Sequence, residues 1–396
     1  MTKIEGSWSN EFVGVKEALA KNLDSGEDIG ASAAVFINGE PVVDIWGGFF
    51  DEARTRQWKS DTIINNFSTT KTMTALCALI LADHGELDLH APVKKYWPEF
   101  AAAGKERIEV RHFLGHTSGL AGWTETVTLE DIYDPEKATT LLARQAPWWE
   151  PGTASGYQPI TFGALIGEVI RRITGKTLGT FFAEGVAGPL GADYHIGTGP
   201  ECDDRVAPLI QSSPFVQPTG RLIPDRAFFN PFVSPQTSAT IASRRAELGG
   251  SNGHGNARSV ALLQSVLSCG GEVRGARLLS HEGCERVFEQ QSDGTDLVFG
   301  IPLRWGMGYA LSNPNVDELY GSRTKGHRVA FWGGSGGSFV LNDLDLRMTV
   351  AFVMNKHVEA GGFDHRSVDI IKAAYDCLVV AKRFGQEQAM RRSASM

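Results

Sequence analysis

The chain has 396 residues, a formal net charge of −8 at pH 7 and 42% hydrophobic residues. This length allows one large domain or two closely joined ones, with enough apolar residues for a core. The acidic balance gives no reason to expect nucleic acid or an anionic membrane as a partner. No segment approaches about 18 uninterrupted apolar residues, so we expect no membrane span.

Neither the N-terminus nor the cysteines and histidines show a targeting or metal-binding pattern. The start, MTKIEGSWSNEF, lacks the apolar stretch of a secretory signal, which favours a cytoplasmic location. A mature form whose signal has been removed would look similar. No C-x-x-C pair or H-E-x-x-H is present, and His112 and His116 lie at a predicted turn, so we expect no metal site. The sequence leaves the oligomeric state open.

In chain order, the first predicted elements are a helix and a hairpin. An amphipathic pattern predicts a helix over residues 10–23. Two strand-like runs follow, residues 31–37 and 42–49. The Asn38-Gly39 pair between them is typical of a tight hairpin turn.

The middle of the chain predicts helices and loops. Residues 161–174 carry an apolar stripe and end at Gly175, as helices often do. A second helix is predicted over residues 257–268. The segment 200–256 is rich in Pro, Ser and Gly, and we expect long surface loops there.

Strands return near the C-terminus, over residues 329–332, 338–342 and 347–354, before a last helix over residues 367–382. Strands at both ends with a helical middle predict an α/β (α+β) fold, with an antiparallel sheet flanked by helices and built from both termini. A mainly helical region is inserted into it. The expected ranges are 8–100 and 295–385 for the sheet domain, 101–294 for the helical, loop-rich region that completes the cleft, and 386–396 for a disordered tail.

The candidate nucleophile is Ser68, in the run NNFSTTKTMTALCALILADHGELDL. Apolar residues at helical spacing predict a helix over residues 69–84, with Gly85 as its stop signal. Because positions i and i+3 share one face of a helix, the Lys71 amine can lie against the Ser68 hydroxyl. The Ser68 N–H stands where helix amides lack an intrahelical partner, so it can bind an oxyanion.

Two observations compete with this interpretation. Ser68 could serve only as a helix N-cap, as serine often does. A second Ser-x-x-Lys match runs from Ser322 to Lys325, in a polar, Gly-flanked stretch that predicts a loop, so no helix holds that pair together. The motif alone supports the two roles of Ser68, nucleophile and helix cap, about equally. The rest of the sequence has to distinguish them.

A second candidate nucleophile, Ser335, lies in the run GGSGG at residues 333–337. This run matches the G-x-S-x-G elbow of α/β-hydrolases, which needs a strand before it, a helix after it, and then an acid and a histidine. Here a turn and two strands follow, and His357 and His365 come after acids that lie in a hairpin turn. We therefore favour a Gly-rich strand edge that a ligand or another backbone approaches closely.

Tyr157 is a candidate third group. A Ser/Lys pair works better with another ionisable side chain that carries the proton to the leaving group. Tyr157 lies in a loop just ahead of the predicted helix 161–174, where it can be presented to a cleft. The alternative is a tyrosine packed at the helix entrance.

Together the motifs resemble those of the serine β-lactamase/penicillin-binding-protein superfamily. They occur in the order of that superfamily: Ser68-x-x-Lys71, HTSGL at 116–120, PG at 151–152 ahead of Tyr157, and WGG at 332–334. The chain is most similar to the family VIII carboxylesterases, the class C β-lactamase-like esterases, over roughly residues 10–380. The resemblance implies an active site between a sheet domain and a helical domain, and a G-x-S-x-G run that is not catalytic.

Two departures from the β-lactamase pattern favour neutral esters. The Tyr-x-Asn motif is here Tyr157-Gln158-Pro159, and Pro159 offers an acylamido group neither a side-chain amide nor an N–H. The Lys-Thr-Gly motif begins here with Trp332, which replaces a cation for the substrate carboxylate by an apolar wall. Four residues are predicted to contact the substrate: Trp332, Gly333, Gly334 and Gln158.

The expected reaction is a two-step acyl transfer on a small carboxylic ester, without a cofactor. Lys71, with its pKa lowered by burial, and Tyr157 deprotonate Ser68, which attacks the ester. Backbone N–H groups of Ser68 and Ser335 hold the oxyanion, Tyr157 protonates the leaving alkoxide, and water releases the acid. Three further tryptophans either line the pocket or belong to the core: Trp123, Trp148 and Trp149.

Other functions fit the same motifs. A β-lactamase or D-amino-acid peptidase would use the same nucleophile, and in an acyltransferase an alcohol or amine would intercept the acyl-enzyme. A non-catalytic scaffold of the same fold is the alternative from a different class. Intact Ser68, Lys71 and Tyr157 argue against the scaffold, which needs none of the three.

Overall fold

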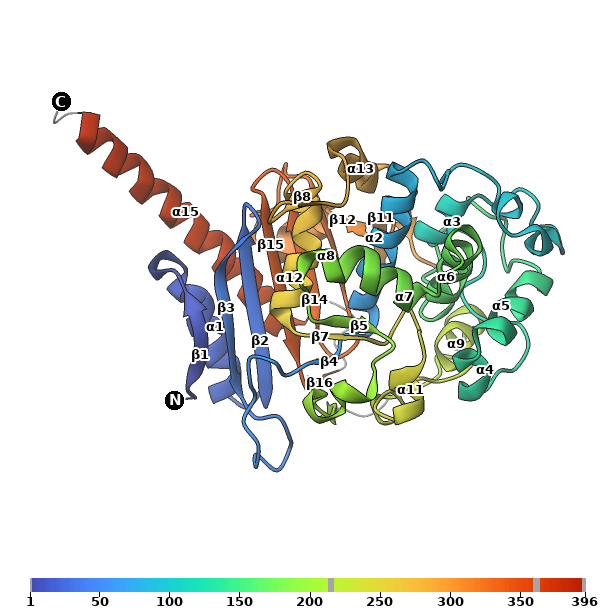
Figure 1. Cartoon of the computed structure of the whole chain (residues 1–396), viewed down its shortest axis with the longest axis horizontal. Helices are drawn as coiled ribbons and strands as arrows, with labels where there is room; N and C mark the ends of the chain where they lie inside the picture. Colours follow the sequence, from blue (N-terminus) through green and yellow to red (C-terminus); the bar gives the residue numbers. More distant parts are fainter. Residues whose placement is uncertain (1, 213–216, 359–363, 394–396) are drawn as a thin grey trace.

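A computed structural model of the chain describes residues 2–212, 217–358 and 364–393, and for residues 382–393 the backbone alone. Its centre is a large antiparallel sheet, seen nearly edge-on in Figure 1. The strands are β1 (Ile4–Trp8), β2 (Gly30–Ile37), β3 (Glu40–Gly48), β10 (Ser292–Thr295), β11 (Pro302–Trp305), β12 (Ala310–Leu311), β13 (Val329–Gly333), β14 (Phe339–Asp343) and β15 (Met348–Met354).

The order of these nine strands is β1-β3-β2-β15-β14-β13-β12-β11-β10, and all neighbours are antiparallel. The pairing of β2 with β15, in which Ala31 lies opposite Met354, joins the strands of the two chain ends. The predicted α/β class, with an antiparallel sheet built from both termini, is therefore confirmed.

The β2–β3 hairpin shows why the sheet is central. Successive residues of a strand point to opposite faces, and here both faces are apolar: Val35 belongs to one buried core and Phe36 to the other. The strands are joined by Asn38 and Gly39, with φ of 53° and 81°, as a two-residue hairpin turn requires. The predicted hairpin is confirmed.

Helices cover both faces of the sheet. On one face α1 (Val13–Asp24) packs against α15 (His365–Ser393), and on the other α12 (Ala257–Ser268) packs against β2, β14 and β15 (Figure 1). Helix α12 lies inside the range 101–294 expected for the helical region, yet it packs on the sheet.

The remaining helices lie mostly between the two groups of strands in the sequence. They are α2 (Thr70–Asp83), α3 (Val110–Leu114), α4 (Leu129–Tyr133), α5 (Pro135–Arg144), α6 (Thr161–Thr174), α7 (Leu178–Phe182), α8 (Gly188–Leu190), α9 (Leu222–Phe229), α10 (Pro235–Ser238), α11 (Ile241–Arg245), α13 (His281–Glu285) and α14 (Pro314–Leu319). Helices α6 and α12 match their predicted ranges, and Gly175 ends α6 with a φ of 71°.

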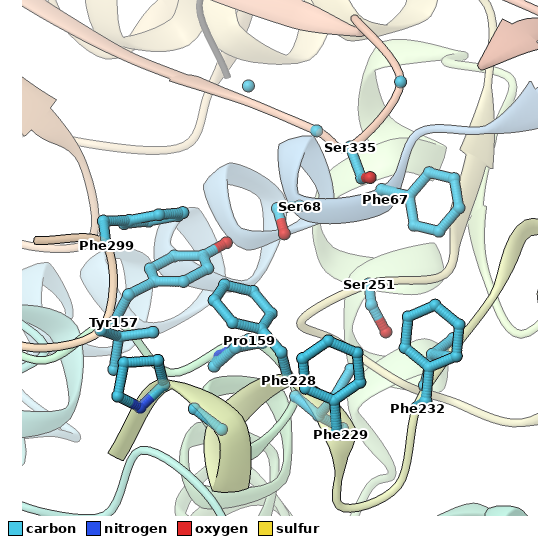
Figure 2. A pocket seen from close by; sticks show the side chains of 18 of the residues that line it. Phe67, Ser68, Tyr157, Pro159, Phe228, Phe229, Phe232, Ser251, Phe299 and Ser335 are labelled. Carbon is cyan, nitrogen blue, oxygen red and sulfur yellow. The ribbon is translucent and has the colours of Figure 1, made fainter. Parts of the chain in front are cut away.

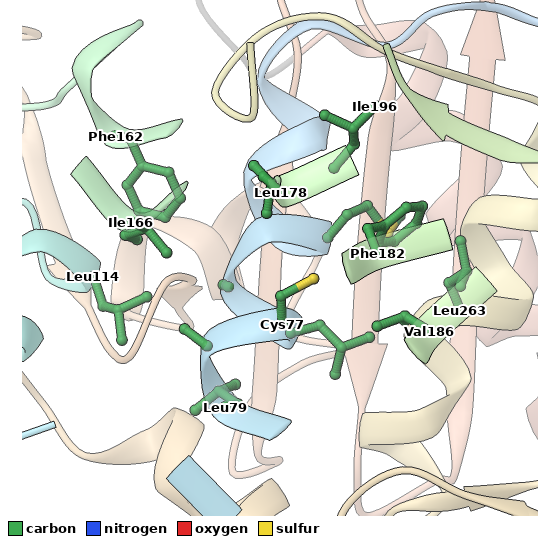
Figure 3. Packing of buried hydrophobic residues seen from close by; sticks show 14 of the residues in the cluster. Cys77, Leu79, Leu114, Phe162, Ile166, Leu178, Phe182, Val186, Ile196 and Leu263 are labelled. Atoms are coloured by element: carbon green, nitrogen blue, oxygen red, sulfur yellow. The ribbon is translucent and has the colours of Figure 1, made fainter. Parts of the chain in front are cut away.

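Helix α2 is buried on every side, from Thr70 to Ala82. Figure 3 shows side chains of α2, among them Cys77 and Leu79, packed among apolar residues of other helices such as Phe162, Phe182 and Leu263. A helix that is buried all round belongs to the interior of a large protein. The residues at its start therefore rest on a rigid base.

A small second sheet leads into α2. It consists of β4 (Ile64–Asn65), β7 (Gly253–Gly255) and β5 (Tyr194–Ile196), in the order β4-β7-β5. Residues 248–257 are buried, so the prediction of long surface loops over 200–256 is wrong for this end of the segment. Residues 253–255 pair within the sheet, and the N–H groups of Ser251 and Asn252 bind the Leu248 carbonyl, so the buried segment keeps backbone partners.

Both chain ends differ from the prediction. At the N-terminus, β1 adds an edge strand that the sequence analysis did not identify. At the C-terminus, α15 continues to Ser393, whereas a disordered tail was expected from residue 386. Residues 386–393 hold no Gly or Pro and several good helix formers, so continuing the helix costs little. Residues 394–396 lie outside the described residues. Within the described residues, none of the helices is both long and apolar enough to cross a membrane.

Candidate active site

Ser68 and Lys71 meet at the start of α2. Ser68 lies in the 3₁₀ turn η2 (Phe67–Thr69), which leads directly into the helix, and Lys71 Nζ is 3.2 Å from Ser68 Oγ. The residues that cap η2 and α2 are Asn66 and Thr69. Ser68 is therefore not a helix cap, and the alternative role for it does not apply.

The second Ser-x-x-Lys match has a different structure. Residues 321–326 form turns after α14, with Ser322 at a φ of 61°. The predicted loop is confirmed. Since no helix brings Lys325 onto one face with Ser322, this match carries no catalytic pair.

The Lys71 amine is buried, with 1% of the residue exposed. Burial lowers the pKa of Lys71 well below its usual range, because the ammonium loses its water there. Nζ also donates to the carbonyl oxygens of Pro159 and Gly250, both at 2.7 Å. A neutral amine has two N–H bonds and one lone pair. In a neutral amine the two carbonyls would take both N–H groups, and the lone pair would face the Ser68 hydroxyl.

Tyr157 is buried beside this pair. Its ring centroid lies 4.7 Å from Lys71 Nζ, and the Trp332 indole donates from Nε1 to the Tyr157 hydroxyl at 3.2 Å. Burial raises the pKa of Tyr157, and hydrogen bonds with Ser68 and Trp332 offset this only in part. The phenol is therefore protonated at neutral pH and is suited to donate a proton. Three sequence-predicted residues, Ser68, Lys71 and Tyr157, thus lie together.

Two side chains that hold Tyr157 were missed by the sequence interpretation. Asp296, wholly buried, accepts from the Tyr157 N–H at 3.1 Å. His116 Nδ1 accepts from the Gln158 N–H at 3.2 Å, and its ring centroid is 5.0 Å from that of Tyr157. Burial and the nearby Lys71 lower the pKa of His116, so the ring is neutral. The HTSGL run signalled His116, whereas Asp296 lies 139 residues from Tyr157 and had no local signal.

Metal-ligand residue types do not gather at this site. In the parts of the chain that the structure describes, no group of three or more His, Cys, Asp or Glu side chains could hold a metal ion. His112 and His116 share i, i+4 spacing but not a partner. His112 Nδ1 accepts from the Glu109 N–H at 3.2 Å, while His116 binds Gln158.

The end of β13 runs beside the residues that precede Ser68. A Cβ added to Gly334 would lie 2.2 Å from the Asn66 carbonyl oxygen, so only glycine fits there. Ser338 Oγ donates to the same carbonyl at 2.8 Å. The Gly-rich strand edge predicted for this run, approached closely by another backbone, is confirmed.

Ser335 does not have the surroundings of an α/β-hydrolase nucleophile. It lies between β13 and β14, and no helix follows it. Its Oγ is hydrogen-bonded to His357 Nε2 at 2.8 Å, but His357 Nδ1 has no partner among the described residues. The acids of the following turn pair elsewhere, Asp343 with His327 and Asp345 with Arg328. Among the described residues, no carboxylate is hydrogen-bonded to His357.

A cavity of about 420 Å³ lies at Ser68. Ser335, His357 and Trp332 also line it, and Figure 2 shows Tyr157 and Ser68 on one side of it. Its volume is in the range of about 300–1,000 Å³ that is common for small-molecule sites. Phenylalanines make up much of the apolar wall: Phe67, Phe228, Phe229, Phe232, Phe299, Phe331 and Phe339.

Three of these phenylalanines come from a segment that the sequence analysis treated as surface loop. Phe228 and Phe229 end α9, and Phe232 follows. The rings of Phe229 and Phe232 stack with centroids 5.3 Å apart. The run RAFFNPF was the available signal, because three phenylalanines within five residues are unusual in an exposed loop.

Gln158 and three tryptophans are not among the residues that line the cavity. Gln158 is wholly buried, and its side-chain amide has no partner among the described residues. The structure therefore does not support its predicted contact with substrate, because its side chain lies in the interior. Each tryptophan indole donates to a partner outside the cavity: Trp123 to Ala138, Trp148 to Thr124, and Trp149 to Ala154.

The sequence and the fold have clear relatives. Residues 15–375 match the family model described as Beta-lactamase. The chain belongs to the β-lactamase family. It is 32% identical over 372 residues to "Esterase/beta-lactamase LipL" of Mycobacterium tuberculosis (strain ATCC 25618 / H37Rv), which covers 89% of this chain and 83% of that protein.

Solved structures of this β-lactamase family agree with the fold. The crystal structure of a family VIII carboxylesterase is 40% identical, with a TM-score of 0.89, and covers 95% of this chain and 100% of that chain. A penicillin-binding protein homologue from Caulobacter crescentus is 36% identical, with a TM-score of 0.88 and the same coverage. The predicted resemblance to family VIII carboxylesterases is confirmed, and the chain is a hydrolase of the esterase/β-lactamase type.

Proposed function

We propose that this chain hydrolyses neutral carboxylic esters through an acyl-enzyme formed on Ser68. One observation carries the proposal: the buried Lys71 amine donates to two backbone carbonyls and faces the Ser68 hydroxyl at 3.2 Å. No carboxylate among the described residues forms an ion pair with Lys71. A lysine held in this way serves as a neutral base, because burial disfavours the ammonium and no carboxylate among the described residues offsets that cost.

Acylation begins with the transfer of the Ser68 proton to the Lys71 amine. Ser68 Oγ then attacks the ester carbonyl and forms a tetrahedral intermediate. The backbone N–H groups of Ser68 and Ser335 stabilise its oxyanion. As the intermediate collapses, Tyr157 gives its phenolic proton to the leaving alkoxide, and the Lys71 ammonium returns a proton to Tyr157.

Deacylation reverses the roles of the same groups. A water molecule loses a proton to the Lys71–Tyr157 pair and attacks the acyl carbonyl. The second tetrahedral intermediate expels Ser68 Oγ, which takes the proton back. The carboxylic acid leaves, and the site regains its starting protonation.

The neutral character of the proposed substrate follows from the wall of the cavity. Trp332 stands where the β-lactamase pattern has a lysine, and its indole binds Tyr157 instead of a substrate carboxylate. The surrounding phenylalanines favour apolar acyl or alcohol groups. The names of the relatives, an esterase/β-lactamase and a family VIII carboxylesterase, support an ester substrate.

Trapping the acyl-enzyme tests the proposal. The wild-type chain is mixed with p-nitrophenyl butyrate, quenched in acid within the first turnovers and digested, and the peptide that carries the butyryl group is identified by mass spectrometry. We expect the group on Ser68. A chromogenic cephalosporin is run in parallel, and faster turnover of it than of the ester would favour the β-lactamase alternative. A butyryl group on Ser335 would overturn the assignment of the nucleophile.

A further inference from the structure

His357 contacts both walls of the proposed oxyanion site. On one side its Nε2 is hydrogen-bonded to Ser335 Oγ at 2.8 Å. On the other side its ring meets the ring of Phe67 edge-on, with centroids 5.5 Å apart. Phe67 directly precedes Ser68, so His357 contacts both segments whose N–H groups are proposed to bind the oxyanion.

The segment that carries Ser335 is rich in glycine. Gly336 and Gly337 have φ of 88° and 123°, which other residues rarely adopt. Glycine gives a segment this freedom at the cost of rigidity. The oxyanion site needs the opposite, because donors stabilise a transition state only when they are already in place. The segment has two turn hydrogen bonds of its own, from the Gly334 N–H to the Ser338 carbonyl at 2.7 Å and from the Gly337 N–H to the Gly334 carbonyl at 3.2 Å. Neither involves Ser335 itself, so contacts from outside the segment help to fix this residue.

Two such contacts reach the glycines around Ser335. His357 binds the Ser335 side chain, and its Cδ2 would lie 2.6 Å from a Cβ on Gly336, so the ring packs directly on this backbone. Arg366 Nη2 donates to the Gly336 carbonyl at 2.5 Å. Arg366 is itself wholly buried between Asp28 and Asp364, which places it in the framework of the fold.

His357 is held in turn by an element separate from the large sheet. It lies in β16 (Lys356–His357), which pairs in parallel with β6 (Ile210–Gln211). Its carbonyl accepts from the Ser212 N–H at 3.1 Å and from Ser212 Oγ at 2.8 Å. The imidazole is thus fixed at its backbone and can serve as an anchor for Ser335.

The hydrogen bond to Ser335 has a defined direction. His357 is 4% exposed, and burial lowers its pKa to about 4, so the ring is neutral at pH 7. Its Nδ1 has no partner among the described residues. A buried N–H without an acceptor is rarer than a buried acceptor without a donor. The ring proton therefore belongs on Nε2, which donates to Ser335 Oγ.

We infer that His357 is a positioning residue that sets the spacing between the Ser335 and Ser68 amides of the oxyanion site, acting through the Ser335 hydroxyl. This inference rests on the proposed function. It gives Ser335 of the G-x-S-x-G run a role without nucleophilic chemistry. The hydrogen bond from His357 to the Ser335 hydroxyl fixes the position of the Ser335 backbone N–H.

Three variants test the inference: His357→Leu removes the donor, His357→Gln keeps an N–H near the Nε2 position, and Ser335→Ala removes the acceptor. With p-nitrophenyl butyrate, we expect His357→Leu to lower kcat about 10- to 100-fold while KM stays within about twofold, as a small misplacement of catalytic donors can do. Affinity for phenylboronic acid, which forms a tetrahedral adduct on a serine nucleophile, should fall by the same factor. His357→Gln should recover most of both losses.

A double-variant comparison shows whether His357 acts through Ser335. In the Ser335→Ala background, His357→Leu should cause no further loss, because the hydrogen bond is already gone. The control is His327→Leu. His327 binds Asp343 at the opposite end of the β13–β14 hairpin, so this variant should keep wild-type kcat and boronate affinity.

The outcomes separate this inference from the proposed function. An unchanged kcat in His357→Leu, or losses that multiply in the double variant, would overturn the positioning role while leaving Ser68 as nucleophile. A rise in KM of about 10- to 100-fold with unchanged kcat in His357→Leu would also overturn the positioning role, since this result would indicate a loss of substrate binding. Wild-type turnover in Ser68→Ala would instead remove the proposed function. Ser335→Ala removes the same hydrogen bond but leaves His357 in place. A loss of kcat in this variant therefore cannot come from a folding defect caused by replacing His357.

Discussion

Ser68 and Ser335 line the same cavity, and each has a basic side chain within hydrogen-bond distance, Lys71 at 3.2 Å and His357 at 2.8 Å. The two sites differ in the further contacts that the basic side chain makes. Lys71 has two carbonyls for its N–H groups and the Tyr157 phenol beside it. His357 has no partner on its second nitrogen among the described residues. A nucleophile needs a complete route for its proton, and only Ser68 has one.

The two serines also differ in how they are held. Ser68 stands at the start of a helix that is buried on every side. Ser335 stands among glycines and depends on a side chain from another element for its position. On the proposed mechanism, the serine at the helix start is the nucleophile, whereas the serine among the glycines presents its backbone N–H. A motif of glycines around a serine therefore does not identify chemistry by itself.

The largest effect should separate the two serines directly. We expect Ser68→Ala to lower kcat/KM for p-nitrophenyl butyrate by about 10⁴-fold or more, since removing a nucleophile collapses the whole catalytic unit. Ser335→Ala keeps the backbone N–H and should cost only about 10- to 100-fold, the same loss as His357→Leu. Steady-state kinetics of both variants, with circular dichroism to confirm folding, provide the measurement. Equal losses in the two variants would contradict the comparison.

The next effect concerns the base. In Lys71→Arg the guanidinium stays protonated at all working pH values, so it cannot accept the Ser68 proton. We expect kcat/KM to fall about 10²- to 10⁴-fold. In the wild type, burial lowers the pKa of Lys71, so the amine loses its proton at a lower pH than free lysine does. kcat/KM should rise with pH along one limb as Lys71 deprotonates. Persistence of that limb in Lys71→Arg would assign it to another group.

Tyr157→Phe should have an effect that depends on the leaving group. A p-nitrophenolate departs without a proton, whereas an alkoxide needs one from Tyr157. We expect a loss of about 10²-fold for ethyl butyrate and a clearly smaller loss for p-nitrophenyl butyrate. Because burial raises the pKa of Tyr157, the phenol stays protonated in mildly alkaline buffer, and the wild type should show no alkaline loss below about pH 10. Equal losses for both esters would argue against Tyr157 as the acid.

The smallest effect concerns the cavity wall that both serines share. Phe232→Ala removes an aromatic ring that stacks on Phe229. We expect kcat/KM for a bulky ester such as p-nitrophenyl octanoate to fall about tenfold, and the value for the acetate to change less than about twofold. Leu222→Ala is the matched control, because Leu222 is exposed and is not among the residues that line the cavity. A uniform loss for both esters would indicate a structural defect instead of a lost contact.

The local parts of the fold could be predicted from the sequence. The hairpin at Asn38-Gly39 and the helices α6 and α12 follow from patterns within a few residues of each other. Errors arose where packing overrode composition. Residues 248–257 are polar and Gly-rich, yet they are buried, with residues 253–255 paired in the small sheet. The end of α15 is a different error. Helix propensity extends this helix to Ser393, where the sequence analysis expected a disordered tail from residue 386.

The candidate site divides in the same way. The sequence by itself determined that Lys71 lies beside Ser68, because residues three apart on a helix share a face. Only the tertiary structure decided how the Lys71 amine is buried and held, because the carbonyls that accept from it belong to residues 88 and 179 positions away. The same holds for Asp296, for His357 and for the phenylalanine wall. These contacts depend on how distant segments pack, and no local spacing along the chain records that packing.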